Sequence, residues 1–274
     1  VDGRQRISAI LDFLEGKFKL NNLRILKQFN GCCFADLDLK QQGVIEDFQL
    51  LFYIIQPPTP ERVKYDIFDR VNRGGTPLNK QEMRNALYRG RCTRMLDKLC
   101  CSPEFLIATG RSINKERMKD QYVVLRAMAF LMLHRGEFKD IPALQYRGDI
   151  DDFLARFMVY VNDNAPEKLI VDYENLFIRC MQISYDLLGE NGFRFSGNGI
   201  RRPINMPLFE ALSYLFSFVP EKIDYTWASR LILDIESVKE EFDDSRYFSG
   251  NIDSTTSVSF RFDRMDKIIN RIQL

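Results

Sequence analysis

The chain has 274 residues, of which 45% are hydrophobic and 28% are charged, and its formal net charge is +1. This composition is typical of a globular protein with a substantial core, and the balanced charge does not imply a general polyanion-binding surface. Any contact with nucleotides or nucleic acid must therefore come from local arginine clusters.

The first part of the chain predicts a mixture of helix and strand. Apolar residues in the segment 7–18 recur at helical spacing, which predicts an amphipathic helix. Residues 23–37 predict two short strands joined by a tight turn at Asn30 and Gly31. The apolar run within 47–58 ends at two prolines and predicts a strand that is buried on both faces.

Two further helices are predicted on either side of a glycine-rich segment. The first spans about 60–71 and stops at "NRGGTP", where Gly74 and Gly75 permit unusual backbone angles. An Asn-x-x-Glu capping pattern at 79–82 then opens a helix over 80–89.

From about residue 92 onward the periodicity is almost entirely helical. Apolar residues at spacings of three and four predict helices over 115–134, 149–163, 172–190, 207–218 and 225–244. We therefore predict an α+β, mostly α, protein, in which a small α/β core over 1–110 precedes an α-helical domain over 111–274.

The opening segment "VDGRQR" suggests a site for an anion. A helix start leaves backbone N–H groups unpaired and favours negative charge, and Gly3 would let the backbone approach a phosphate closely. Arg4 and Arg6 supply forked donors, Gln5 can orient a water, and Asp2 could hold a Mg2+ ion between itself and the phosphates. A solvated turn whose arginines pair with Asp2 or Glu15 is the commoner explanation for such a short charged segment, so the segment alone decides nothing.

A family resemblance favours the first interpretation. "VDGRQRISAI" resembles the DGQQR-type signature of the N-terminal domain of GmrSD-type restriction endonucleases. "IFDRVNRGGTPLNKQEMRNALYRG" is similar to the second block of that family, and "RMKDQYVVLRAMAF" and "DDFLARFM" resemble the segments that follow. The resemblance covers about residues 1–160 with the segments in the same order.

The resemblance implies a ParB/sulfiredoxin-like, nucleotide-binding core, NTPase activity, and a role in prokaryotic defence against foreign or modified DNA. The matching positions are Asp2, Gly3, Gln5 and Arg6 in the first motif and Arg70, Asn72, Gly75, Pro77, Leu78, Glu82, Arg84 and Asn85 in the second. Arg4 departs from the family's glutamine. The family's upstream motif is absent, so we expect the core to be incomplete at its N-terminus.

These matches define the expected site. The candidate catalytic residues are Asp2, Gln5 and Arg6, and Asp2 is also the candidate Mg2+ ligand. The candidate nucleotide-binding residues are Gly3, Arg4, Arg70, Asn72, Gly74, Gly75 and Thr76. For Glu82 and Arg84 we favour structural roles, as a helix cap and as the partner of an acid such as Asp69.

Three functions remain open. The first is a nucleoside triphosphate hydrolase of a restriction-type defence protein. The second is a non-catalytic nucleotide- or DNA-binding module that regulates a separate nuclease subunit, and a homodimer is compatible with either. The third is a ParB-like DNA nuclease. HNH-type cleavage is not expected, because the lone histidine, His134, lies at the end of an apolar helix, where a structural role is commoner.

Two basic clusters are candidates for nucleic-acid contact. They comprise Arg89, Arg91 and Arg94 in "YRGRCTR", and Arg201 and Arg202 in "GIRRP". The alternative for both is an ordinary solvated surface.

The six cysteines lack the spacing of a zinc site, and buried free thiols in a reducing compartment explain them best, which predicts a cytoplasmic protein. There is no apolar run of about 20 residues and no segment that resembles a signal peptide, so we expect no membrane contact. P-loop, serine-hydrolase and dinucleotide-binding motifs are also absent from the sequence.

Overall fold

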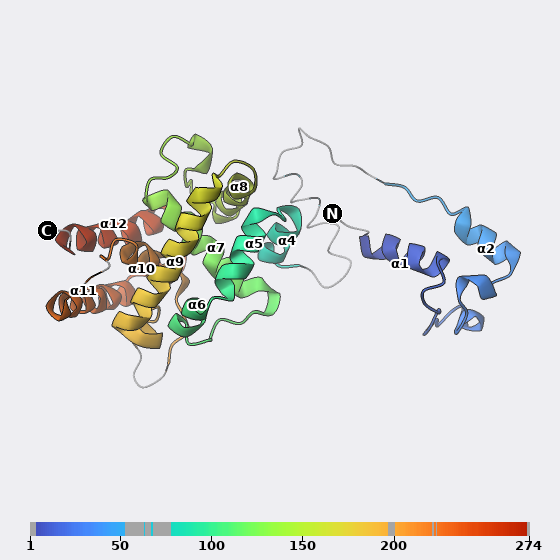
Figure 1. Ribbon diagram of the computed structural model, residues 1–274, viewed down its shortest axis with the longest axis horizontal. Coiled ribbons are helices and arrows are strands. Elements are labelled where there is room, and N and C mark those ends of the chain that lie inside the picture. Colours follow the sequence, from blue (N-terminus) through green and yellow to red (C-terminus); the bar gives the residue numbers. More distant parts are fainter. Residues whose placement is uncertain are drawn as a thin grey trace. The chain divides into compact units, whose positions relative to one another are not determined.

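The computed structural model describes residues 4–52, 63, 67, 78–196, 201–220, 222 and 224–272. The chain divides into two compact units, Val1–Leu78 and Asn79–Leu274, which we call unit 1 and unit 2 (Figure 1). The described residues are mostly helical and include no strand. The predicted division into functional domains near residue 110 stays a prediction.

Unit 1 has short helices around a small aromatic cluster. Its elements are α1 (Arg4–Leu14), η1 (Lys27–Phe29), η2 (Phe34–Asp36) and α2 (Leu39–Glu46), where η denotes a 3-10 helix. The ring of Phe13, which is 7% exposed, lies 5.6 Å from the ring of Phe18 and 5.9 Å from that of Phe34. These contacts hold α1 against the turn that follows it and against η2.

The two strands predicted over 23–37 are wrong, because the segment forms η1 and η2 instead. The turn at Gly31 does have the positive φ that the sequence predicts, at +88°. However, the side chain of Asn30 accepts from the Leu23 N–H at 2.8 Å and donates to the Leu23 carbonyl at 3.2 Å. It thereby occupies backbone groups that a strand ladder would use.

The strand predicted within 47–58 is not confirmed either. Its described residues, 48–52, are neither helix nor strand, and Phe48 and Leu51 are 69% and 80% exposed. The rest of that run lies outside the described residues, as does most of the predicted helix over 60–71, of which Val63 and Ile67 are helical. A buried strand needs partners on both edges and both faces, and the described part of unit 1 offers none. The predicted ParB/sulfiredoxin-like α/β core is therefore not confirmed.

Unit 2 is a helical bundle with short 3-10 turns between its helices (Figure 1). The α-helices are α4 (Lys80–Leu87), α5 (Arg91–Cys100), α6 (Pro103–Ala108), α7 (Lys119–His134), α8 (Ile150–Asp163), α9 (Glu167–Leu188), α10 (Met206–Phe216), α11 (Tyr225–Asp244) and α12 (Thr255–Ile272). The 3-10 helices are η4 (Glu116–Met118), η5 (Pro142–Leu144), η6 (Gly189–Asn191) and η7 (Arg246–Phe248).

The centre of unit 2 is formed by α7 and α10. Residues 123–132 of α7 and 207–216 of α10 are buried without interruption, because both helices are apolar nearly all round. The two pack against each other, α5 and α8 also contact α7, and α9 and α12 also contact α10. The helical periodicity read from the sequence is thus confirmed throughout unit 2, and α11 has the bounds predicted for it.

An ion-pair cluster lies inside this core. Glu210 of α10 is held between Arg126 of α7 and Arg261 of α12, whose Nη2 lies 3.0 Å from its carboxylate. Arg126 also pairs with Asp253 at 2.6 Å, so two cations face two carboxylates. Glu210 and Arg261 are 0% exposed and Arg126 is 1% exposed. Such a cluster is stable only while each charge keeps its partner.

The thiols are free, and half of them are buried. Cys92, Cys100 and Cys180 lie in the core of unit 2, whereas Cys101, next in the chain to Cys100, is exposed. Burial raises the pKa of the Cys180 thiol to about 12, although the charges of nearby arginines oppose this.

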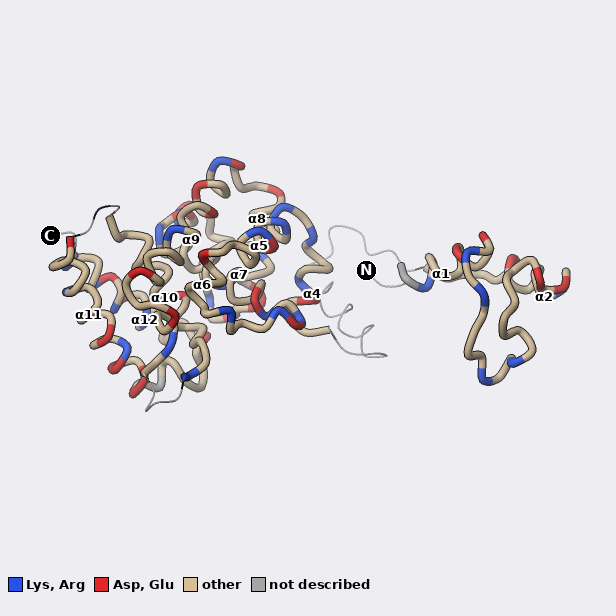
Figure 2. The backbone as a smooth tube through the Cα atoms, turned by 60° about the horizontal axis from the view of Figure 1, so that its bottom comes forward, with Lys and Arg blue, Asp and Glu red and all other residues tan. Residues whose placement is uncertain are grey.

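The surface carries both signs of charge. Basic and acidic residues are interspersed along the backbone of each unit, in keeping with the small net charge (Figure 2). Within the described ranges, no helix has the length and apolar character needed to cross a bilayer, and no group of three or more His, Cys, Asp or Glu side chains is arranged to bind a metal ion.

Candidate functional site

The first predicted motif lies at the start of α1. Asp2 and Gly3 fall outside the described residues, whereas Arg4, Gln5 and Arg6 form the first turn of α1 rather than a loop ahead of it. This corrects the sequence interpretation. The Arg6 side chain is exposed, and no acidic residue occupies the first turn of the helix. The Arg6 side chain therefore lies near the positive end of the helix dipole.

The glycine-rich part of the second motif lies outside the described residues. It contains Arg70, Asn72, Gly74, Gly75 and Thr76. Their convergence with the first motif stays a prediction, and so does the Mg2+ site at Asp2.

The last part of the second motif forms α4, and Glu82 caps it as predicted. The Glu82 carboxylate accepts the Asn79 N–H at 2.6 Å, while the Asn79 side chain accepts the Glu82 N–H at 2.9 Å. The same carboxylate pairs with Arg117 at 2.9 Å. The hydrogen bond from Arg117 lowers the pKa of Glu82, against a smaller opposing effect of burial. Glu82 is therefore engaged in holding the start of α4 to the segment before α7.

Arg84 has the structural role predicted for it, but with another partner. It is 0% exposed, and its Nη1 donates to Asp151 of α8 at 2.8 Å, so Asp151 takes the place suggested for Asp69. Its Nε donates to Gln81 at 3.1 Å, and its guanidinium lies 5.2 Å from the centre of the Tyr122 ring. Burial raises the pKa of Asp151, but the hydrogen bonds from Lys80 and Arg84 outweigh it and lower that pKa overall.

The first predicted basic cluster divides into one paired arginine and two exposed ones. Arg91 donates to the Ala165 carbonyl at 3.0 Å and pairs with Glu167 at 3.1 Å, which links α5 to the start of α9. Arg89 and Arg94 are exposed. Contact with nucleic acid through this cluster stays a prediction.

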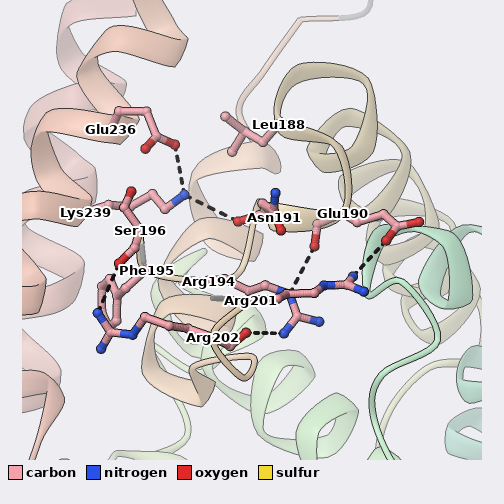
Figure 3. Close-up of a pocket in the computed structure, with 10 residues that line it drawn as sticks. All are labelled: Leu188, Glu190, Asn191, Arg194, Phe195, Ser196, Arg201, Arg202, Glu236 and Lys239. Carbon is pink, nitrogen blue, oxygen red and sulfur yellow. Dashed lines mark hydrogen bonds and ion pairs between the residues drawn. The ribbon is translucent and has the colours of Figure 1, made fainter. Parts of the chain in front are cut away.

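The second predicted cluster borders a polar hollow of about 650 Å³, shown in Figure 3. We call it the Arg194 hollow. Glu236 and Lys239 reach it from α11, while the other side chains come from the end of α9, from η6 and from the loop that leads to α10. Its lining comprises Leu188, Glu190, Asn191, Arg194, Phe195, Ser196, Arg201, Arg202, Glu236 and Lys239.

Three of the four cations at this hollow have a carboxylate partner. Arg201 pairs with Glu190 at 2.8 Å, Arg202 pairs with Asp243, and Lys239 pairs with Glu236 at 2.8 Å. The fourth cation is Arg194. Sequence reasoning identified Arg201 and Arg202 but missed Arg194 and Lys239, because neither has another basic residue beside it in the sequence. The signal that could have found Arg194 is its position between two phenylalanines, which indicates burial.

Comparison with known families finds a match at the start of the chain. About the first third of the chain matches a domain of restriction endonucleases. The family is the GmrSD restriction endonuclease, N-terminal domain, and its model matches residues 1–89, which confirms the resemblance seen in the sequence. No curated protein and no solved structure matches the chain significantly.

Proposed function

We propose that the chain is part of a restriction-type defence protein whose amino-terminal motifs bind and hydrolyse a nucleoside triphosphate. The observation that carries this proposal is the family match over residues 1–89, because that range contains both "DGRQR" and "NRGGT". In this proposal unit 2 senses foreign or modified DNA or transmits the nucleotide state.

The first turn of α1 is suited to part of this task. The N-terminal end of a helix favours an anion through its dipole, and Arg4 and Arg6 would add charge that can bind phosphate oxygens in pairs. Arg70 would complete the phosphate contacts, and Gln5 and Asn72 would position water or sugar. Catalysis would come mainly from positive charge placed where negative charge develops during phosphoryl transfer, with Asp2 holding Mg2+.

The test is Arg6→Ala, with Arg24→Ala as the matched control. Both side chains are exposed in unit 1, so neither change should alter the melting temperature appreciably. We expect Arg6→Ala to lower the rate of phosphate release from GTP or ATP by roughly 100-fold or more, the scale of losing one transition-state donor. Arg24→Ala should keep the wild-type rate. Equal rates in the two variants would refute the role of Arg6.

Arg4 supports a second candidate, a non-catalytic module that regulates a separate nuclease. An arginine in place of the family's glutamine keeps affinity for phosphate but offers no acceptor to orient an attacking water. Saturable nucleotide binding without phosphate release would favour this candidate. Nicking of plasmid DNA with a divalent metal would instead favour the ParB-like nuclease.

A further inference from the structure

The Arg194 hollow contains a buried guanidinium without an anionic partner. Arg194 is 4% exposed. Its Nε donates to the Glu190 carbonyl at 3.2 Å, its Nη1 to the Arg202 carbonyl, and its Nη2 to the Thr109 carbonyl at 3.2 Å and to the Ser112 hydroxyl. All four acceptors are neutral. In the part of the chain that the structure describes, no carboxylate lies within ion-pair distance of Arg194.

A buried guanidinium without an anionic partner destabilises the folded protein, and the charges around Arg194 increase this effect. Burial lowers the pKa of Arg194, the nearby charge of Arg201 lowers it further, and the charge of Glu190 opposes this only in part. Arginine nevertheless stays protonated in proteins, so the positive charge persists at neutral pH. A negative charge in the hollow would stabilise this arrangement.

Donors for such an anion are available at the edge of the hollow. The Arg201 side chain is 46% exposed, and among the described residues only its Nη2 is bound, to Glu190. Lys239 donates to Glu236 and, at 3.4 Å, to the Asn191 carbonyl, which leaves one of its three N–H groups unused. Figure 3 shows Lys239 on one side of the hollow with Arg194 and Arg201 across from it.

The backbone beside the hollow leaves room for the Arg201 head group. Gly110 has φ +58°, and a Cβ there would overlap Arg201 Nη2 and lie 2.7 Å from Glu190 Oε2. A residue with a side chain would therefore displace the pair. Gly110 lets the Arg201–Glu190 pair lie against the chain after α6, within the lining of the hollow.

We propose that the Arg194 hollow binds a small phosphorylated molecule through its phosphate group. A phosphate carries nearly two negative charges and three acceptor oxygens, which suits several cationic donors converging from different directions better than a single carboxylate does. The volume of about 650 Å³ lies within the range of small-molecule sites. The hollow lies wholly in unit 2 and outside residues 1–89, so it is distinct from the nucleotide site of the proposed function.

The experiment is a calorimetric titration of the full chain with inorganic pyrophosphate and, separately, with AMP, at low ionic strength. The titrations use the Arg6→Ala background, so that a phosphate site at the start of α1 contributes nothing. We expect saturable binding of at least one of the two. Loss of nucleotide hydrolysis in Arg6→Ala and loss of this binding are separate results, so either proposal can fail without the other.

Two opposite substitutions test the geometry. Arg201→Gln removes a donor and should weaken binding at least tenfold. Glu190→Gln releases Arg201 from its competing carboxylate and removes a negative charge, so it should tighten binding about threefold or more. Arg271→Gln is the matched control: Arg271 is 59% exposed, pairs with Asp234 and does not line the hollow, so affinity should not change.

Three results would overturn the proposal. The first is the absence of binding by both probes. The second is an equal loss of affinity in Arg201→Gln and Arg271→Gln, which would indicate general charge attraction. The third is a DNA oligonucleotide that displaces pyrophosphate with higher affinity and the same dependence on Arg201, because the hollow would then be a nucleic-acid contact.

Discussion

Unit 2 buries arginine in two contrasting ways. Arg126 pairs with both Glu210 and Asp253, and Arg261 pairs with Glu210, so the charges in the core cluster balance. Burial works against the charge of Arg126, but the attraction of Glu210 and Asp253 outweighs it and raises the pKa of Arg126. Among the described residues, Arg194 binds neutral acceptors alone. Burial lowers the pKa of Arg194 and also that of Arg261, so what separates the two sites is the presence of a carboxylate partner. The balanced cluster is therefore a structural element, whereas the unbalanced arginine points to a ligand.

The largest expected effect comes from unbalancing the core cluster. Glu210→Gln keeps the shape of the side chain but leaves Arg126 and Arg261 with Asp253 alone. We expect the free energy of unfolding to fall by about 3–5 kcal/mol, the usual result of removing one partner of a buried ion pair. Urea unfolding followed by circular dichroism measures it.

A surface pair provides the control for Glu210. Glu167 is exposed and pairs with Arg91, so Glu167→Gln should cost less than about 1 kcal/mol. If both variants lost the same small amount, the core cluster would contribute no more than a surface pair, and the comparison with Arg194 would fail.

His134 shows a third way to bury a basic group, which is to keep it neutral. Its ring stacks on Phe262 with centroids 3.6 Å apart, and among the described residues its buried Nε2 has no partner. Burial, and secondly the charge of Arg261, lower its pKa to about 3. The ring therefore packs against the core of unit 2, which agrees with the structural role favoured from the sequence.

This burial predicts a pH dependence of stability. The unfolded chain protonates His134 near pH 6.5, whereas the folded chain does not until about pH 3, so the stabilisation is complete above pH 6.5 and is lost as the pH falls toward 3. Between pH 7 and 5 we expect His134 to account for a loss of about 2 kcal/mol. Urea unfolding of His134→Phe over this range should show a correspondingly flatter profile. Identical profiles would mean that the folded protein accepts the proton.

A smaller effect on the free energy of unfolding than that of Glu210→Gln is expected from Arg194. Arg194→Gln removes donors from neutral acceptors but also removes an uncompensated charge, so we expect a loss of about 1–2 kcal/mol. Pyrophosphate should raise the melting temperature of the wild-type chain but not that of the variant. A loss as large as that of Glu210→Gln would instead make Arg194 primarily a structural tie between loops.

The sequence predicted unit 2 far better than unit 1. Helices such as α8 and α11 follow from local periodicity, and each is stabilised because its apolar face packs against the core of unit 2. The apolar run around Phe48 and Leu51 carries an equally clear signal for burial, yet both residues are exposed. A strand depends on partners distant in the chain, and neither periodicity nor propensity shows whether those partners are present.

The candidate sites show the same limit. The sequence indicated Arg201 and Arg202 as a basic pair and Glu82 as a helix cap, because each pattern involves residues close together in the chain. Arg194 and Lys239 are 45 positions apart in the sequence, and only the packing of α11 beside η6 brings them to one hollow. The sequence does not show that Arg194 lacks a carboxylate partner among the described residues, because this depends on which residues pack around the side chain in the folded protein.

The neighbouring thiols of Cys100 and Cys101 at the end of α5 make local unfolding measurable by cysteine alkylation. Cys101 should react with an alkylating reagent at once, whereas Cys100, Cys92 and Cys180 are shielded and hard to ionise. A short pulse of reagent followed by mass spectrometry would then time the exposure of each shielded sulfur, with the adjacent accessible one as the reference. The transient unfolding of individual helices could thus be followed with the native cysteines, without an added label.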